Sequence, residues 1–396
     1  MSLQTSTLNL HLRSKIKFGI NVIDKELAAS ILLEKKKKVF IVTDKGLIQA
    51  GVIDRIINLL QEQDISTVVF SDVGPNPTAE SVMEGLSAYN QEDCDMILAI
   101  GGGSALDFAK ALGVVASNPG HILDFRRGGK PIANPIPLLF ALPTTVGTGS
   151  EVTAVAVITD TTSERKVGIV SPLLIPDTVF VDPSLTSKLP RNHVAATGLD
   201  AFVHSIEAYT TIRANPLTDG LAVQAMKMIL EYLPRTYAHP DDAEARAQVH
   251  LASTIAGLAF ASSGLGLVHS CSHPMSALYK VPHGLANAIF LPFVLSHNLI
   301  SNQKKYADIA RMFDKKLVFE EDAVAAQKLV PLVRMFLDEL DIPKDFHYMS
   351  ERFTDDMIDR MAEDAMSDVA PTLANPRKVH KEDIIKIYKQ ALPCKS

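Results

Sequence analysis

The first half of the chain alternates short apolar segments with amphipathic ones. Three runs of apolar, largely β-branched residues have the length of buried parallel strands: residues 39–42, 67–70 and 96–100. Between them, residues 52–63 and 79–89 repeat apolar side chains at helical spacing. Strand, helix and strand in this order predict right-handed βαβ units, and therefore a parallel sheet with helices on both faces.

More strands are predicted before residue 187. Residues 135–142 have the apolar pattern of another strand of the sheet. Residues 155–160 and 166–170 flank the polar turn 161–165, and this arrangement predicts a β-hairpin. We expect the hairpin to be added to the same sheet.

The pattern changes near the pairs Asp182-Pro183 and Leu189-Pro190. Beyond them, long segments with a period of 3.6 residues dominate: residues 192–210, 217–232, 243–262, 286–297 and 323–340. The sequence therefore predicts a Rossmann-like α/β domain over residues 1–187 and an all-α domain over residues 188–396, both of ordinary domain size.

Composition excludes several classes of protein. The 396 residues include 39 Lys and Arg against 45 Asp and Glu, a net charge of -6, which argues against nucleic acid as a partner. Three cysteines without a CxxC pair exclude a disulfide scaffold and a thiolate zinc site. No apolar run reaches membrane-span length, and residues 1–14 lack a signal-peptide pattern, so we expect a cytoplasmic protein with no membrane partner.

Two loops follow predicted strands and carry small residues. Gly101-Gly102-Gly103-Ser104 lies between a strand and a helical run, where backbone N–H groups and the helix dipole bind phosphate. The hydroxyl-rich loop 143–150 also follows a strand. Neither loop matches GxGxxG, and no GxxxxGK[ST] occurs, so plain tight turns remain an alternative. Their shared place at the carboxyl ends of parallel strands favours a nucleotide site.

Asp44 closes the first predicted strand. A carboxylate at that position commonly binds the ribose hydroxyls of NAD and repels the 2′-phosphate of NADP. A turn or helix-cap role within Thr43-Asp44-Lys45-Gly46 is the alternative.

Histidines and one aspartate form a candidate metal site. Asp200 and His204 lie four residues apart in a predicted helix, so they share a face and can bind one ion. His269 and His273 form a second such pair, and His283 follows. A thiolate-free set of this kind suits Fe(II), Zn(II), Mn(II) or Ni(II). Hydrogen-bonded core histidines are the alternative for each residue taken singly.

Two details refine this constellation. One unbroken helix would separate residues 269 and 283 by about 21 Å, so the chain must turn back, and Pro282 and Gly284 are suited to that turn. Glu207 shares the helix face of Asp200, but we favour a solvated or capping carboxylate over a contact with a metal ligand.

The sequence resembles the iron-containing (group III) alcohol dehydrogenases over nearly its whole length. The residues that carry the resemblance are Pro75 to Thr78, Gly101 to Ser104 with Asp107 and Lys110, Pro143 to Thr145, Gly149 to Thr153, Ala196 to Asp200 with His204, His269 to Pro274, Pro282 to Ala288, and Asn375 to Arg377.

The resemblance implies a dehydroquinate synthase-like fold, in agreement with the two predicted domains. By this likeness the metal ligands are Asp200, His204, His269 and His283. His273 matches the family histidine that stays off the metal near the nicotinamide, and it is the candidate catalytic residue.

The resemblance also implies an NAD site, with the pyrophosphate at the Gly101 loop and Asp44 at the position that discriminates NAD from NADP. The residues expected to bind the cofactor are Asp44, Asn76, Gly101, Gly102, Gly103, Ser104, Asp107, Thr144, Thr145, Ser150, Val152 and Lys166.

The implied reaction is hydride transfer between NAD and a primary alcohol or short diol, giving the aldehyde. The ion would be a Lewis acid toward the alcohol oxygen, and His273 would relay the proton to solvent. Residues 154–156 are more apolar than in members that act on short diols. The family suggests a homodimer or an assembly of dimers.

Other functions stay open from sequence. Glycerol dehydrogenase-like polyol oxidation would use the same layout. A lyase of the dehydroquinate synthase type would need several basic residues for its anionic substrate, and no such cluster lies near the motifs. A non-catalytic metal- or nucleotide-binding protein is disfavoured because the ligand, relay and glycine-loop sets occur together.

Overall fold

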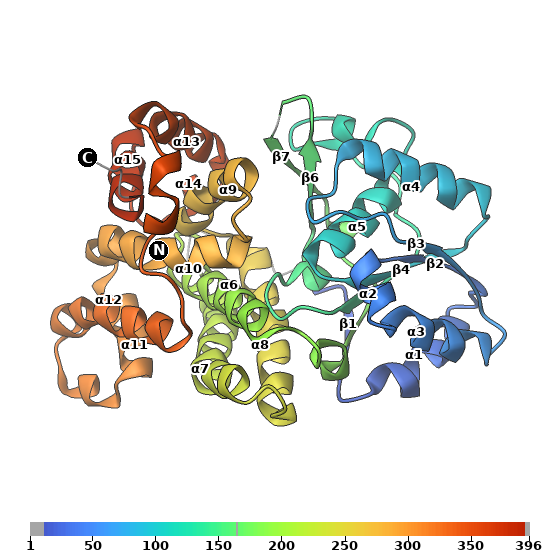
Figure 1. Cartoon of the computed structure of the whole chain (residues 1–396), viewed down its shortest axis with the longest axis horizontal. Helices are drawn as coiled ribbons and strands as arrows, with labels where there is room; N and C mark the ends of the chain where they lie inside the picture. The colour runs from blue at the N-terminus through green and yellow to red at the C-terminus, as the bar shows by residue number, and fades with distance from the viewer. Residues whose placement is uncertain (1–11, 164, 393–396) are drawn as a thin grey trace. The chain divides into compact units, whose positions relative to one another are not determined.

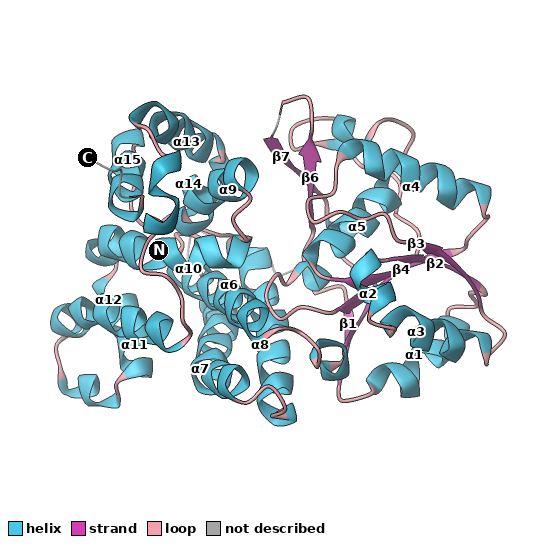
Figure 2. Ribbon diagram, in the orientation of Figure 1, coloured by secondary structure: helices cyan, strands magenta, loops and turns pink. Residues whose placement is uncertain are grey.

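The computed structural model describes residues 12–163 and 165–392. This part of the chain divides into two compact units, one ending at Leu189 and the other beginning at Pro190. Residues 1–11 lie outside the described residues, and they include most of the segment 1–14 in which no signal-peptide pattern is found. Cys394, one of the three cysteines, also lies outside them. Figure 1 shows the course of the chain, and Figure 2 shows that strands are confined to the first unit.

The first unit is built on a parallel sheet of six strands in the order β1-β8-β5-β4-β2-β3. The strands are β1 (Lys15–Phe18), β2 (Lys38–Val42), β3 (Ser66–Phe70), β4 (Met96–Gly101), β5 (Leu139–Pro143) and β8 (Thr178–Val181). The predictions at residues 39–42, 67–70 and 96–100 are confirmed. The strand predicted over 135–142 begins only at Leu139, because Pro135 and Pro137 have no N–H for a sheet ladder.

Helices cover both faces of this sheet, as the βαβ pattern predicts. They are α1 (Val22–Leu33), α2 (Lys45–Gln49), α3 (Val52–Gln61), α4 (Ala79–Gln91) and α5 (Gly103–Ser117). Val39 and Ile41 share a core cluster with α1 and α3. Phe40, which points to the opposite face, contacts Tyr89 of α4 with ring centroids 5.4 Å apart.

The predicted hairpin exists, but its expected place in the sheet is wrong. Strands β6 (Val155–Asp160) and β7 (Arg165–Val170) pair antiparallel in a separate two-stranded sheet. The N–H of Val157 donates to Asp107 Oδ2 at 3.0 Å, so the outer edge of β6 is bound to a side chain of α5. A carboxylate therefore takes a bonding position that a neighbouring strand would have used.

In the described residues the second unit is helical throughout, as predicted. Its α-helices are α6 (Arg191–Thr210), α7 (Pro216–Ala238), α8 (Ala243–Ser263), α9 (Leu267–Tyr279), α10 (His283–Asn298), α11 (Gln303–Phe313), α12 (Asp322–Glu339), α13 (Asp355–Ser367), α14 (Val369–Ala374) and α15 (Lys381–Ala391). Helix α6 is buried along most of its length and packs against α7, α8 and α10.

Helix α10 is unusually apolar. The segment His283–Ser301 is long and apolar enough to cross a membrane by length and composition, and the bent pair α8 and α9 passes the same test if it is taken as one span. In the structure, 61% of the His283–Ser301 window is buried inside the protein. Its apolarity is therefore that of a core helix.

Candidate functional site

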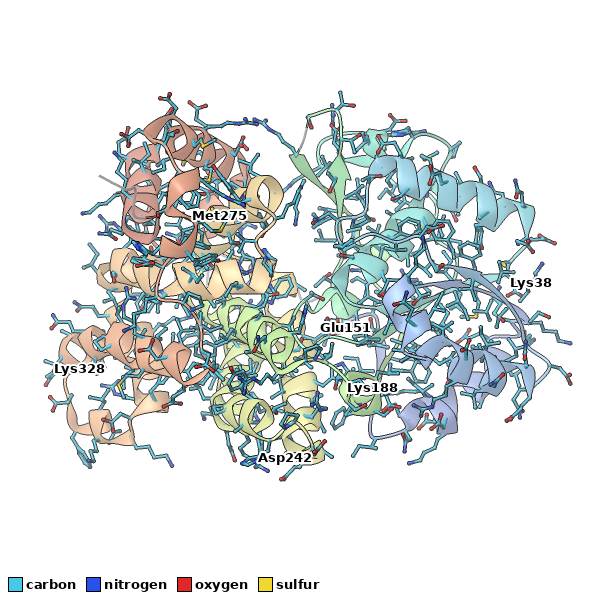
Figure 3. All side chains as sticks on the ribbon, viewed as in Figure 1. Lys38, Glu151, Lys188, Asp242, Met275 and Lys328 are labelled. Carbon is cyan, nitrogen blue, oxygen red and sulfur yellow. The ribbon has the colours of Figure 1, made fainter. Side chains whose placement is uncertain are left out.

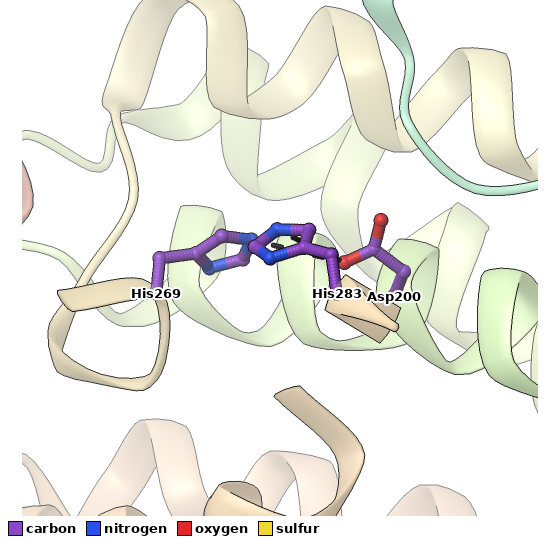
Figure 4. A group of neighbouring side chains, drawn as sticks. All are labelled: Asp200, His269 and His283. Atoms are coloured by element: carbon purple, nitrogen blue, oxygen red, sulfur yellow. Dashed lines mark ion pairs between the residues drawn. The ribbon is translucent and has the colours of Figure 1, made fainter. Parts of the chain in front are cut away.

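Three helices of the second unit bring the predicted metal ligands together. Asp200 and His204 lie on α6, His269 lies in the first turn of α9, and His283 is the first residue of α10. Figure 4 shows Asp200, His269 and His283 directed toward one another. Their ligand atoms all lie within 4.8 Å of one another.

The distances converge on one oxygen of Asp200. Its Oδ1 is 3.8 Å from His269 Nε2 and 3.8 Å from His283 Nε2. It is 3.9 Å from the Nε2 of His204, a residue that lies outside the group of three. The His204 ring stacks on that of His269 with centroids 4.7 Å apart. Two ligands held about 2.1 Å from one tetrahedral ion are about 3.4 Å apart, so the set fits a divalent cation in spacing and in donor type.

A close approach of two backbones places His283. Helix α9 ends at Tyr279, where Lys280 has a left-handed conformation, and α10 begins after Pro282. The predicted reversal of the chain is therefore confirmed. A Cβ on Gly284 would lie 2.2 Å from the carbonyl oxygen of Ala196, so only glycine lets α10 begin directly against α6.

Glu207 lies behind His269 and contacts it, so the expectation that it makes no contact with a proposed metal ligand is wrong, whereas the expected capping role is confirmed. It is buried, and its Oε2 lies 2.6 Å from His269 Nδ1. Its Oε1 accepts the N–H of Val268 at 2.7 Å, so it also caps the first turn of α9. Burial raises the pKa of Glu207 to about 7 and lowers the pKa of His269 to about 3. A carboxylate at Nδ1 fixes the tautomer that leaves the Nε2 lone pair for a metal.

His273 has a different partner, which sequence reasoning missed. Its Nδ1 lies 2.7 Å from Asp368 Oδ2, and the two side chains are 33% and 29% exposed. The His273 ring stacks on that of His283 with centroids 5.3 Å apart. Asp368 is 95 residues away in the sequence and belongs to none of the motifs, so no local pattern could identify it.

In the first unit, the two small-residue loops lie against each other. The N–H of Thr144 donates to the carbonyl of Gly101 at 3.0 Å. A Cβ on Gly102 would lie 3.0 Å from Thr145 Cγ2, and one on Gly103 would lie 2.9 Å from Thr148 Cγ2. Ser104 Oγ donates to the carbonyl of Pro75 at 2.6 Å and so ties in the loop that contains Asn76. These residues gather at the N-terminus of α5, a place suited to phosphate.

A buried network holds the second loop. Ser150 Oγ donates to Asp107 Oδ1 at 2.6 Å, and Lys110 Nζ donates to Ser150 Oγ at 2.9 Å. Burial raises the pKa of Asp107 and lowers that of Lys110 to about 8. The charge of Lys166 on β7 opposes the shift of Asp107. The side chains of Asp107 and Ser150 therefore brace the loop.

Neighbouring residues of this loop are buried as well. The side chain of Val152 is buried, and so is that of Glu151, which Figure 3 labels.

Asp44 has the cap role that the sequence left open. Its Oδ1 accepts the N–H of Leu47 at 3.1 Å, at the start of α2. Its Oδ2 faces the first glycine loop, 3.7 Å from the Cβ position of Gly101. One carboxylate oxygen is thus engaged by the backbone, and the other is directed to the predicted pyrophosphate loop.

Removal of one proposed ligand tests the metal site. We expect His269→Ala and His283→Ala to lose bound metal and activity together, because each removes a nitrogen from the converging set. Metal analysis of anaerobically purified protein and steady-state rates check this, with the exposed His239→Ala as a control that keeps both. A full metal complement in either ligand variant would contradict the assignment.

Comparison with known proteins agrees with this geometry. The model of the family "Iron-containing alcohol dehydrogenase" matches residues 14–183, and that of the "Fe-containing alcohol dehydrogenase family, C-terminal" matches residues 194–392. The chain is 38% identical over 368 residues to the NAD-dependent methanol dehydrogenase of Bacillus methanolicus, covering 93% of this chain and 96% of that one. It is 37% identical over 357 residues to the 1,3-propanediol dehydrogenase of Klebsiella pneumoniae, covering 90% and 91% of the two chains.

A solved structure supports the same assignment. The crystal structure of a 1,3-propanediol oxidoreductase has a TM-score of 0.93 to this chain at 35% identity, covering 98% of this chain and 100% of that one. The predicted fold class is confirmed. The prediction of an alcohol or diol oxidoreductase that works with NAD(P) and iron is confirmed as well. Since both halves of the sequence match, the chain belongs to the iron-containing alcohol dehydrogenase family.

Proposed function

We propose that this protein transfers hydride between NAD and a primary alcohol or short diol, giving the aldehyde. Residues 188–396 would carry the ligands of Fe(II), which are Asp200, His204, His269 and His283. Residues 1–187 would bind NAD. The observation that carries the proposal is the convergence of two imidazole Nε2 atoms on Asp200 Oδ1, each at 3.8 Å.

The proposed reaction is balanced in atoms and in charge. An alcohol and NAD⁺ give an aldehyde, NADH and one proton. When bound, the ion supplies Lewis acidity toward the alcohol oxygen, and the nicotinamide ring supplies the hydride acceptor. What remains for the protein is to hold the ligands and to move the proton.

His273 is suited to move that proton. With Nδ1–H donated to Asp368 Oδ2, Nε2 is the nitrogen left to accept a proton. The side chain is one third exposed, which suits a group that passes a proton to water. Asp368 would fix the tautomer and orientation of the ring.

The glycine loops are suited to the cofactor. Gly101, Gly102, Gly103 and Ser104 surround the N-terminus of α5, where N–H groups and the helix dipole would bind the pyrophosphate. Asp44 Oδ2 would accept hydrogen bonds from the adenosine ribose. The remaining proposed cofactor residues are Asn76, Asp107, Thr144, Thr145, Ser150, Val152 and Lys166.

We further propose a soluble cytoplasmic homodimer or assembly of dimers. Support comes from β1, an edge strand whose Ile16 and Phe18 are 38% and 40% exposed. A second copy would cover these side chains and the outer edge of β1, which within the described residues pairs only with β8.

A cofactor and substrate panel tests the proposal. Protein stripped with a chelator and reloaded anaerobically with Fe(II) should form NADH from primary alcohols or short diols, and the stripped protein should not. Absorbance of NADH gives the rate, and zinc reloading serves as a comparison. No turnover of any alcohol or aldehyde by the iron-loaded protein would refute the proposed reaction.

Replacement of His273 separates proton relay from metal binding. We expect His273→Ala to retain its metal while kcat falls by roughly 10²-fold, the usual size of a general acid–base contribution. Asp368→Asn should lose less, and it should lose nothing further in the His273→Ala background, because Asp368 acts through that ring. Asp359→Asn, an exposed carboxylate change on α13, is the control. Metal loss in His273→Ala would instead make His273 a ligand.

The cofactor preference tests Asp44. Its carboxylate would repel a 2′-phosphate, so Asp44→Gly should raise kcat/KM for NADP. Loss of a charged hydrogen bond should weaken NAD use by roughly 10- to 150-fold. Asp44→Asn retains an oxygen to cap α2 while removing the charge, so it separates cofactor choice from local stability. An unchanged ratio of the two cofactors in both variants would leave Asp44 with its cap role alone.

A further inference from the structure

Asn287 places a side-chain amide at the point where the proposed ligands converge. It lies on α10 one turn after His283 and is fully buried. Its Nδ2 donates to Asp200 Oδ1 at 2.7 Å and lies 3.1 Å from His269 Nε2 and 3.2 Å from His283 Nε2. One amide thus contacts ligand atoms from α6, α9 and α10.

The lone pairs decide which of these contacts is compatible with a cation. An imidazole Nε2 has one lone pair, so a nitrogen that binds a metal cannot also accept from Asn287. A carboxylate has about four acceptor positions on its two oxygens, so Asp200 can bind a cation and accept from the amide together. Asp200 is also the nearest of the three and the charged one, which favours its hydrogen bond. The bond to Asp200 is therefore the contact that serves metal binding.

Comparison with a second buried asparagine of α10 argues against a purely structural role for Asn287. Asn298, also buried, donates from Nδ2 to Asn375 Oδ1 at 2.8 Å and accepts from Asn375 Nδ2 at 2.9 Å. Both ends of that amide are satisfied. Among the described residues, Asn287 Oδ1 is buried without a hydrogen-bond partner. Leaving a buried acceptor unpaired is unfavourable, so the fold alone gives little reason for this amide at position 287.

We propose that Asn287 is a positioning residue of the metal site, whose amide N–H fixes the Asp200 carboxylate in the orientation that binds a divalent cation. The inference rests on the proposed metal site. It assigns to Asp200 the kind of supporting partner that Glu207 provides for His269. Such partners orient ligands and typically change metal affinity 10- to 100-fold when they are removed.

The test measures Zn(II) affinity of the full chain, by competition with a chromophoric chelator. We expect Asn287→Ala to bind Zn(II) about 10- to 100-fold more weakly than the wild type. Asn298→Ala is the matched control: the same residue type is removed from the same helix, also from a buried position, and its affinity should stay unchanged. The visible spectrum of Co(II)-loaded protein should change in the Asn287 variant and not in the control.

A milder variant keeps the proposal testable if Asn287→Ala folds poorly. Asn287→Ser retains a hydroxyl donor on a shorter side chain, and we expect a smaller loss of affinity. Unchanged Zn(II) affinity in both Asn287 variants, or an equal loss in Asn298→Ala, would overturn the proposal while leaving the metal site standing. A different result would refute the metal site itself: the wild type binds no Zn(II), or His269→Ala binds it as tightly as the wild type does. This proposal would then be wrong as well.

Discussion

A buried carboxylate is the constraint on which the helical unit depends. Asp200 is 3% exposed, and its Oδ1 is the point toward which three histidine nitrogens and one amide are directed. A carboxylate charge in such a place is unfavourable unless it is hydrogen-bonded or binds a cation. The packing of α6, α9 and α10 supplies those partners, and it requires Gly284 where α10 meets the backbone of α6.

The supporting residues follow from the same constraint. A ligand atom is useful only if its lone pair points to the shared position, and side-chain rotation alone does not ensure this. Glu207 fixes His269 through Nδ1, and Asn287 holds Asp200 through Nδ2. The aspartate and one histidine of the set thus each have a polar neighbour that restricts rotation. The rigidity needed for a metal site comes from this layer of contacts as well as from the helices.

The sequence was sufficient to predict the elements that a local residue pattern identifies. Apolar runs located β2, β3 and β4, and histidine spacing with Pro282 and Gly284 located the reversal between α9 and α10. It failed where contacts are long-range. Strands β6 and β7 are held by long-range contacts such as the hydrogen bond from Val157 to Asp107, and the partner of His273 lies 95 residues away. Glu207 shares a helix face with Asp200, but only the packing of α9 decides that it meets His269.

Two histidines on one helix show how environment divides the work of identical side chains. His269 and His273 are four residues apart, and each has a carboxylate at Nδ1, at 2.6 Å and 2.7 Å. Their exposures differ, 1% against 33%. Burial lowers the pKa of His269 and separates it from water, so it remains a neutral donor of a lone pair. His273 is partly open to solvent, as its proposed role of proton relay requires. Exposure is not the only factor, because His283 is 31% exposed and still directs its Nε2 to Asp200 Oδ1. The proposed roles of metal ligand and proton relay therefore depend on which carboxylate each ring meets as well as on its exposure.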